Sequence, residues 1–287
     1  MTDDSSALSS GPEEPSSTAR TGIDTTVPHS ARIWNYWLGG KDNFAVDRAA
    51  GDAWAATFPG VRDIARASRS FLTRSIHYLA AEAGIRQFLD IGTGLPAADN
   101  THQVAQRVAP EARIVYVDND PLVLAHARAL LTSTPEGATA YIHADLRDPD
   151  KILAEAAEAL DFTKPIALIL SGVLGHVVDI GEARSIVRGL MDALPSGSYL
   201  SLNDGTSVVG GDQVEQATQD YNESGALPYI QRTPEEIASF FDGLELVPPG
   251  VVSCPRWRPD PAPADSAERV HLGGRHIGDG IGPPARA

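Results

Sequence analysis

A glycine-rich turn is the stretch of this chain best suited to hold a ligand. Residues 88–96 read Phe-Leu-Asp-Ile-Gly-Thr-Gly-Leu-Pro, so an apolar run leads into Gly92 and Gly94. Glycine has no Cβ and adopts a positive φ easily, which lets the backbone of such a turn approach a ligand closely. A plain strand–turn–helix connection would have the same pattern, so the turn alone does not define a site.

Polar residues also follow the next three predicted strands. A carboxylate at Asp118 could accept hydrogen bonds from both hydroxyls of a ribose, and Asp145 could accept one from an exocyclic amino group. Leu122 and Leu146 could pack on the two faces of an adenine ring, and Ser171 opens the polar stretch after the fourth strand. Because parallel strands end at the same edge of a sheet, these residues together predict a nucleotide-like ligand.

The elements that would position these groups alternate along the chain. The predicted strands cover residues 86–91, 113–117, 138–143, 165–170 and 198–202, and the predicted helices cover 100–108, 121–131, 149–160, 182–194, 213–224 and 233–241. This alternation indicates an α/β fold, with a mostly parallel sheet and helices on both faces. Two last strands, over 244–253 and 269–276, have no helix between them and predict an antiparallel hairpin.

Composition divides the chain into three parts. Residues 1–27 are rich in Ser, Thr, Pro and acidic residues, which predicts a disordered acidic tail. Residues 28–83 contain an aromatic segment and two predicted helices, over 45–57 and 61–83, and we interpret this part as an N-terminal helical cap. Residues 84–287 would form the Rossmann-like domain.

A short polar loop joins the aromatic segment to the helices of the cap. Packing on a core explains the aromatic residues, but two glycines followed by Lys41, Asp42 and Asn43 indicate a loop that closes over a ligand. Among the arginines of the second helix, Arg69 is the one that we expect on the ligand side.

Charge and cysteine content exclude some classes of protein. The formal net charge of −15 argues against nucleic acid and against an anionic membrane surface as partners. The single cysteine, Cys254, excludes an intrachain disulfide and fits a reducing compartment. The polar start does not resemble a signal peptide, and no apolar run is long enough to span a bilayer, so the expected location is cytoplasmic.

Two cofactors are compatible with an acidic residue on the ribose: a nicotinamide dinucleotide and S-adenosylmethionine. Dinucleotide sites bind the pyrophosphate through Gly-x-Gly-x-x-Gly, and here Ala97 stands at the third position, which the pattern tolerates. However, Pro96 stiffens the loop, and no second glycine-rich half follows. The backbone of the Gly-Thr-Gly turn could meet both the amine and the carboxylate of S-adenosylmethionine, which is therefore favoured.

Four stretches resemble an actinobacterial family of S-adenosylmethionine-dependent methyltransferases that was first classed as a domain of unknown function. They are Ala31–Phe44, Gln87–Pro96, Val115–Pro121 and Trp257–Asp260, and the resemblance covers about residues 29–260. It implies a class I methyltransferase fold. In that fold a seven-stranded, mostly parallel sheet with an antiparallel last strand lies under an N-terminal helical cap.

The resemblance also implies roles for individual residues. Asp90 and the turn Gly92-Thr93-Gly94 would face the methionine moiety, Asp118 would hold the ribose, Asn119 would lie beside the adenine, Asp145 would hold the adenine amino group, and Lys41, Asp42 and Asn43 would form a cap loop over the site. One departure concerns the fourth strand. The family tends to read Leu-His-His after it, whereas this chain has Leu174-Gly175-His176 and so lacks one imidazole.

We therefore predict an enzyme that transfers a methyl group from S-adenosylmethionine to a small-molecule acceptor by in-line displacement. Such a displacement needs close, oriented reactants but no metal, and the sequence shows no metal-ligand spacing. His176 is the candidate general base, with Leu174 expected to contact the acceptor, while His102 and Asp204 are weaker candidates for the base. The alternatives are a non-catalytic S-adenosylmethionine-binding protein, such as a sensor or assembly partner, and a nicotinamide-dependent oxidoreductase.

Overall fold

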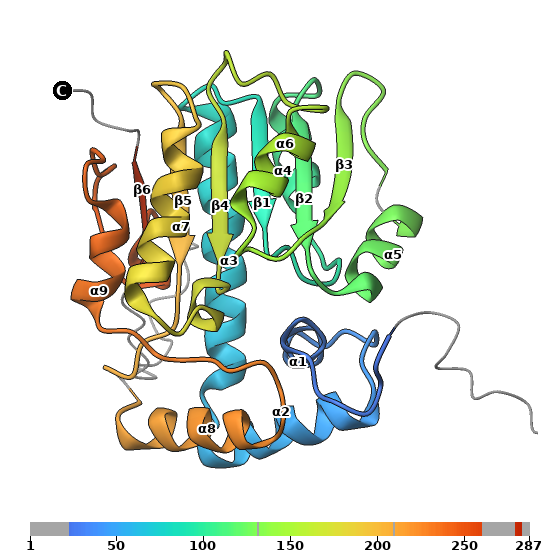
Figure 1. Cartoon of the computed structure of the whole chain (residues 1–287), viewed down its shortest axis with the longest axis vertical. Helices are drawn as coiled ribbons and strands as arrows, with labels where there is room; N and C mark the ends of the chain where they lie inside the picture. Colours follow the sequence, from blue (N-terminus) through green and yellow to red (C-terminus); the bar gives the residue numbers. More distant parts are fainter. Residues whose placement is uncertain (1–22, 131, 209, 260–278, 283–287) are drawn as a thin grey trace, which may run out of the picture.

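A sheet of six strands lies at the centre of the part of the chain that the structure describes (Figure 1). The structure is a computed structural model, and it describes residues 23–130, 132–208, 210–259 and 279–282. Across the sheet the order is β3 (Ala138–His143), β2 (Arg113–Asp118), β1 (Gln87–Ile91), β4 (Ala167–Ser171), β5 (Tyr199–Asn203) and β6 (Asp279–Gly282). Strands β1 to β5 are parallel, and β6 pairs antiparallel with β5.

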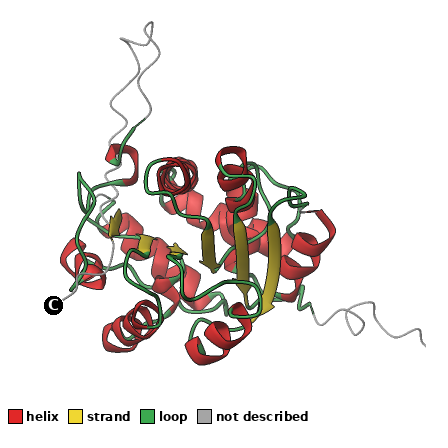
Figure 2. Ribbon diagram, turned by 90° about the horizontal axis from the view of Figure 1, so that it is seen from above, coloured by secondary structure: helices red, strands yellow, loops and turns green. Residues whose placement is uncertain are grey.

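The helices lie in layers on both faces of this sheet (Figure 2). They are α1 (Ser30–Trp37), α2 (Ala45–Thr57), α3 (Val61–Ala81), α4 (Thr101–Val108), α5 (Pro121–Leu130), α6 (Pro149–Ala156), α7 (Ile180–Asp192), α8 (Asp212–Glu223) and α9 (Pro234–Ala238), with short 3₁₀ turns at Leu174–His176, Ser239–Phe241 and Cys254–Arg256. None of the helices in the described ranges is both long and apolar enough to cross a bilayer.

Side-chain alternation along the strands explains why both faces are covered. In β1, Leu89 and Ile91 pack into the core on the side of α6 and α7, whereas Phe88 packs into the core on the side of α3 and α4. Successive strand residues point to opposite faces, so a strand such as β1, which is buried at every position, needs a helical layer on each side. The predicted α/β class is confirmed.

The number of strands differs from the expected seven, since the described residues contain six. The predicted strand over 244–253 is wrong: this segment forms turns, because Pro248 and Pro249 have no N–H to donate to a ladder and Gly250 has a φ of 80°. Its predicted partner over 269–276 lies outside the described residues. The strand that runs antiparallel to β5 is β6, further along the chain than expected.

The helices α1 and α2 and the first turns of α3 form a cap over the carboxyl ends of the parallel strands (Figure 1). The core of the cap contains Ile33 and Trp37 of α1 and also Tyr221 of α8. Trp54 of α2 lies between Trp37 and Tyr221, with ring centroids 5.8 and 5.7 Å apart. Helix α8 therefore belongs to the cap in space, although the boundaries 28–83 place it outside; those boundaries stay a prediction.

Buried ion pairs of Arg32 link the cap to Asp120 in the loop after β2. Nε of Arg32 in α1 lies 3.6 Å from Oδ2 of Asp120 and 3.7 Å from Oδ1 of Asp47. All three side chains are almost completely buried. Because a buried charge is tolerated only when it is paired, this group holds α1 in one position over the end of β2.

The predicted acidic tail is described only in part, since residues 1–22 lie outside the described residues. Just after them, the carbonyl oxygens of Asp24 and Val27 accept hydrogen bonds from the Arg32 guanidinium. Ile23 packs against the small cluster that contains Leu95. The division at residue 28 remains a prediction.

Candidate functional site

The turn after β1 has the conformation that its glycines predict. Gly92 and Gly94 have φ values of 74° and 68°. A Cβ on Gly92 would lie 2.5 Å from Cγ2 of Val173, whereas a Cβ on Gly94 would meet no described atom within 4 Å. The Thr93 hydroxyl donates to the Asp90 carbonyl at 2.9 Å. Gly92 thus packs against the turn after β4, and Gly94 faces an open cavity.

Asp118, the last residue of β2, lies directly beside this turn. Its Oδ2 accepts a hydrogen bond from the Gly94 N–H at 2.9 Å, and its Oδ1 accepts one from the Asp120 N–H at 2.9 Å. Burial raises the pKa of Asp118 to about 6. A carboxylate has about four lone-pair sites, so Asp118 can still accept hydrogen bonds from a ligand that reaches the cavity.

Asp90 and Arg69 also lie near the glycine turn, and both border the same cavity. Oδ2 of Asp90 accepts a hydrogen bond of 2.5 Å from the Thr101 hydroxyl, and burial raises the pKa of Asp90 to about 6, although attraction to Arg69 lowers it in part. The Arg69 guanidinium donates to the carbonyls of Ala98 and Asp99, each at 3.0 Å from Nη2. Arg69 thereby ties α3 to the loop that follows the glycine turn.

These groups border one cavity between the sheet and the cap, which we call the strand-end cavity. Its walls come from Asp90, residues 92–98, Asp118 and residues 171–173 on the sheet side, and from residues 29–31, Trp34, Asn35, residues 38–40, Ala65, Ser68, Arg69, Leu72 and His176 on the other side. Four of the predicted cofactor-binding elements therefore lie around the same space, namely Asp90, the turn Gly92–Gly94, Asp118 and Ser171.

A smaller side cavity adjoins the strand-end cavity. Gly92, Asp118, Val173 and His176 border both. The remaining walls of the side cavity are Ile91, Asn119, residues 144–147, Val177 and Leu227. The residues predicted on the adenine side, Asn119, Asp145 and Leu146, thus line the same cavity. Gly92 of the glycine turn also borders this cavity.

The side cavity offers both a polar and an apolar surface. Asp145 is half-buried, and its Oδ1 accepts the Arg147 N–H at 2.8 Å, which holds the carboxylate in place. Leu146 is buried. Leu122 does not border this cavity; it packs with Leu95 instead, so the prediction that it contacts the ring is wrong.

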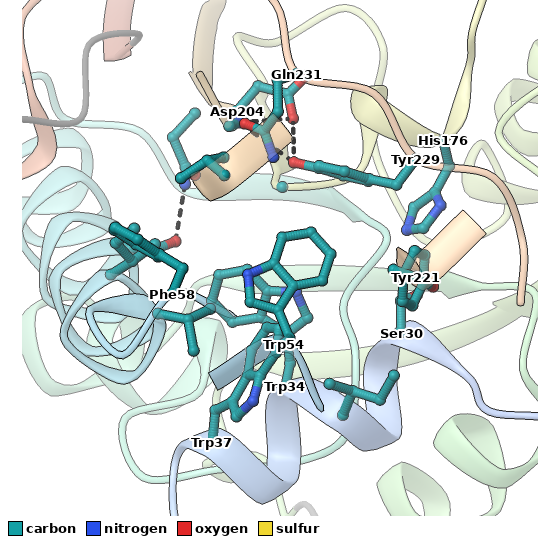
Figure 3. A pocket seen from close by; sticks show the side chains of 18 of the residues that line it. Ser30, Trp34, Trp37, Trp54, Phe58, His176, Asp204, Tyr221, Tyr229 and Gln231 are labelled. Atoms are coloured by element: carbon teal, nitrogen blue, oxygen red, sulfur yellow. Dashed lines mark hydrogen bonds between the residues drawn. The ribbon is translucent and has the colours of Figure 1, made fainter. Parts of the chain in front are cut away.

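A third cavity, which we call the aromatic cavity, lies beside the strand-end cavity and shares part of its lining, and Figure 3 shows the side chains around it. Ser30, Trp34, Ser68, Gly172 and His176 border both cavities. Six aromatic side chains line it, namely Trp34, Trp37, Trp54, Phe58, Tyr221 and Tyr229. Figure 3 shows the three indoles at one end of the cavity and Asp204, Gln231 and the Tyr229 hydroxyl gathered at the other.

His176 is the residue that borders all three cavities. Its Nδ1 lies 2.9 Å from the Pro228 carbonyl, and because a carbonyl can only accept, we assign the proton to Nδ1 and a lone pair to Nε2. Burial lowers the pKa of His176, and its ring packs edge-on against Tyr229 with centroids 5.1 Å apart. The imidazole is therefore neutral near pH 7 and suited to accept a proton.

The two weaker base candidates are placed less favourably. His102 is buried with Nδ1 2.9 Å from the Tyr116 hydroxyl, and it borders none of the three cavities. Asp204 borders the aromatic cavity, but its oxygens already accept from the Tyr229 hydroxyl at 2.9 Å and from Arg232 at 3.1 Å. Across the described ranges, His, Cys, Asp and Glu side chains form no group of three that could hold a metal ion.

The polar loop after α1 lies at the rim of the site. Gly39 and Gly40 border the strand-end cavity, but Lys41, Asp42 and Asn43 border none of the three cavities. Instead, Oδ1 of Asn35 accepts hydrogen bonds from the Asp42 N–H at 3.0 Å and from the Asn43 side chain at 2.9 Å. The loop is thus folded onto α1, and its two glycines are the part closest to the ligand space.

Leu174, which we expected to contact the acceptor, lies away from all three cavities. Its side chain is fully buried in the core and borders none of the cavities, because the short 3₁₀ turn directs it under the sheet edge. Gly175, which follows it, packs so closely on the Tyr229 ring that a Cβ would overlap Cε2. Tyr229 therefore occupies the space that a second imidazole would need.

The aromatic cavity itself was not found from sequence. The aromatic residues near α1 were interpreted as core packing, and Trp37 does pack in the cap core, but Trp34 and Trp37 also line the cavity. No sequence pattern marks Tyr221, Tyr229 or Gln231 as residues of a ligand site. Only the three-dimensional fold brings α8 and the segment after it to α1 and α2.

Comparison with known proteins gives three findings. A family model described as S-adenosyl methyltransferase matches residues 16–276. The chain is similar to a DUF574 family protein from Streptomyces avermitilis, with 44% identity, a TM-score of 0.84, and coverage of 91% of this chain and 99% of that one. It is also similar to a candidate methyltransferase from Thermobifida fusca, with 40% identity, a TM-score of 0.82, and coverage of 94% and 100%. No curated protein matches the chain.

Proposed function

The chain belongs to the S-adenosyl methyltransferase family, and on that premise we propose that it methylates a small molecule held in the aromatic cavity. Membership makes it an S-adenosylmethionine-dependent methyltransferase with a class I fold. Membership argues against the nicotinamide-dependent and the non-catalytic alternatives. The acceptor, the residue roles and the cytoplasmic location belong to the proposal; the single cysteine supports the location, and the net charge of −15 supports a small-molecule partner.

The strand-end and side cavities fit S-adenosylmethionine in their donor and acceptor chemistry. In the proposal, Asp118 accepts from the ribose hydroxyls, while Asp145 and Leu146 take the adenine in the side cavity. The methionine end lies along the glycine turn, where Gly94 leaves the backbone accessible and Asp90 stands behind it. Asp118 borders both cavities, which is what a residue between the adenine and the methionine moiety must do.

The observation that carries the proposal is the junction of the strand-end and aromatic cavities. Methyl transfer requires the acceptor atom within about 3–3.5 Å of the methyl carbon, so the acceptor must lie in a space that opens directly onto the cofactor. Trp34, Gly172 and His176 line both cavities, and in the proposal the two cavities meet there. Its apolar walls also keep water away from the reacting atoms.

At this junction His176 has the role of general base in the proposal. When bound, S-adenosylmethionine supplies the methyl group, whose bond to sulfur breaks as its bond to the acceptor forms, with the electron pair remaining on sulfur. The proton of the acceptor's hydroxyl or amine passes to Nε2 of His176. Nδ1 stays bonded to the Pro228 carbonyl, which keeps the ring oriented while it takes up the positive charge.

Two measurements test this function. Calorimetric titration should give saturable binding of S-adenosylmethionine and S-adenosylhomocysteine and none of NADH. Incubation with a methyl-labelled donor and a small-metabolite extract should then label a component of low molecular mass. Binding of NADH without S-adenosylhomocysteine would contradict the cofactor assignment, and label that enters only protein or nucleic acid would contradict the small-molecule acceptor.

A further inference from the structure

The polar atoms of the aromatic cavity point to the chemical class of the acceptor. We propose that this cavity takes a flat, uncharged aromatic molecule that carries hydrogen-bond donors, such as a phenol or an aryl amine. The inference rests on the proposed function, because it assumes that the aromatic cavity holds the methyl acceptor.

The walls of the cavity favour a flat ring. Trp34, Trp37, Trp54 and Tyr221 form a continuous edge-to-face series, with successive ring centroids 5.8, 5.8 and 5.7 Å apart. Such a series is rigid and presents π faces and ring edges, which pack best against another aromatic ring. A flexible aliphatic acceptor would leave much of this surface without contact.

Some polar side chains that line the aromatic cavity have atoms without hydrogen-bond partners. Seven buried side-chain nitrogen or oxygen atoms have no partner among the described residues, and three of them belong to residues that line this cavity. These three are Oδ1 of Asn203, the hydroxyl of Tyr221 and Oε1 of Gln231. Leaving a buried polar group unpaired costs about 1–3 kcal/mol, so such a concentration indicates that a ligand supplies the partners.

The orientation of the Gln231 amide shows which kind of partner is missing. The Thr218 hydroxyl donates its hydrogen to the Val214 carbonyl at 2.7 Å, so it can only accept from Gln231. Nε2 of Gln231 therefore faces Thr218, and Oε1 is the atom left without a partner. Because an amide oxygen only accepts, the ligand must bring an O–H or N–H group to it.

The charges around the cavity favour an uncharged ligand. Among the described residues that line it there is no Lys or Arg, so an anionic acceptor would be desolvated without a counter-charge. Asp204 is the one carboxylate in that lining, and it is already paired with Arg232 at 3.1 Å and bonded to the Tyr229 hydroxyl. A cationic acceptor would therefore find no unpaired negative charge there.

The test is calorimetry on the protein saturated with S-adenosylhomocysteine, with four probes that share the naphthalene ring system. A dihydroxynaphthalene supplies two donors, a dimethoxynaphthalene supplies none, a hydroxynaphthoate adds an anion, and a naphthyl trimethylammonium adds a cation. We expect the dihydroxynaphthalene to bind at least about tenfold more tightly than each of the others.

A substitution assigns this preference to one atom. Gln231→Leu keeps the approximate shape but removes the acceptor, so it should weaken the dihydroxynaphthalene about tenfold and leave the dimethoxynaphthalene and S-adenosylhomocysteine unchanged. Gln216→Leu, on the exposed side of α8, is the matched control and should change none of these affinities.

Each other outcome overturns the inference. Equal or tighter binding of the anion, of the cation or of the dimethoxy probe would show that the cavity does not select uncharged donors. Failure of all four probes, with S-adenosylhomocysteine still bound, would show that the cavity does not take aromatic acceptors, while the proposed function would stand. Failure of S-adenosylhomocysteine itself to bind would overturn the proposed function together with this inference.

Discussion

The backbone N–H of Gly94 donates a hydrogen bond of 2.9 Å to Oδ2 of Asp118. This bond joins the turn after β1 to the end of β2, and it places a residue without a side chain next to a buried carboxylate. Both residues border the strand-end cavity, and Asp118 also borders the side cavity. In our proposal this is where the adenosyl group of the cofactor lies.

The carboxylate of Asp118 is expected to supply much of the cofactor affinity. Asp118→Asn should weaken the binding of S-adenosylhomocysteine about 10–100-fold, because a hydrogen bond to a charged group contributes about 1.5–3 kcal/mol. Calorimetry measures this directly, with Asp192→Asn at the exposed end of α7 as the control. Unchanged affinity would mean that Asp118 serves only to cap the strand end.

Cofactor binding should weaken at acid pH. Asp90 and Asp118 both have their pKa raised to about 6 by burial, so without ligand they add stability in the protonated form, and this stability is lost as the pH rises through about 6. In the proposed site, the ribose hydroxyls would donate to the ionised form of Asp118. The rise in melting temperature caused by S-adenosylhomocysteine should therefore be small at about pH 5 and reach its full size by about pH 7.

A thermal-shift series with and without ligand checks this pH dependence. Asp118→Asn should flatten it, because the substituted side chain does not titrate. A ligand-induced shift in the unsubstituted protein that is constant between these pH values, or larger at the acid end, would contradict the assignment.

His176 should affect the rate far more than cofactor binding. His176→Gln is expected to lower kcat for the labelled acceptor about 10²–10⁴-fold, with the affinity for S-adenosylhomocysteine changed less than about threefold. Since burial lowers the pKa of His176, the rate of the unsubstituted enzyme should stay level down to about pH 6.5. His77→Gln, on the exposed side of α3, is the control, and an unchanged kcat in His176→Gln would exclude the role of base.

The contact between Gly175 and Tyr229 should make position 175 intolerant of any side chain. Gly175→Ala is expected to destabilise the protein by about 1–3 kcal/mol, since its Cβ would overlap the tyrosine ring. Gly189→Ala in α7 meets nothing within 4 Å and should instead stabilise the protein by about 0.4–1 kcal/mol. Urea unfolding compares the two, and an equal effect at both positions would show that the Tyr229 ring moves aside.

The attachment of the cap should depend on the buried charges around Arg32. Arg32→Met leaves the carboxylates of Asp47 and Asp120 without their cation and is expected to lower the free energy of unfolding by about 3–5 kcal/mol. The exposed pair formed by Arg66 and Asp63 at 2.8 Å is the comparison, and Arg66→Met should change stability very little. Similar changes in the free energy of unfolding for the two substitutions would show that the buried ion pairs of Arg32 stabilise the protein no more than an exposed pair does.

The parts of the site that follow strands could be predicted from sequence because their signals are local. A glycine turn, Asp118 and Asp145 each stand directly after an apolar run, and parallel strands bring such ends together whatever the details of packing. The same argument gave the α/β class. It could not give the edge strand β6, because residues 279–282 read Asp-Gly-Ile-Gly and contain one large apolar residue, which is no strand pattern.

The acceptor side could not be predicted, because no single segment contains it. Trp34 and Trp54 come from α1 and α2, whereas Tyr221 and Gln231 come from α8 and the loop after it. These two parts of the chain are far apart in sequence, and they meet only because of how the cap packs. Leu174 was misplaced for a related reason. Sequence order puts it beside His176, but the 3₁₀ turn between β4 and α7 sends the two side chains in different directions.

A crystal structure of the protein with S-adenosylhomocysteine, in which anomalous scattering locates the sulfur atom, tests the central claim most directly. We expect the adenine beside Asp145, the ribose on Asp118, and the sulfur facing the opening between Trp34 and His176 into the aromatic cavity. A sulfur atom that faces away from this opening, or a cofactor bound outside the strand-end cavity, would contradict methyl transfer into the aromatic cavity.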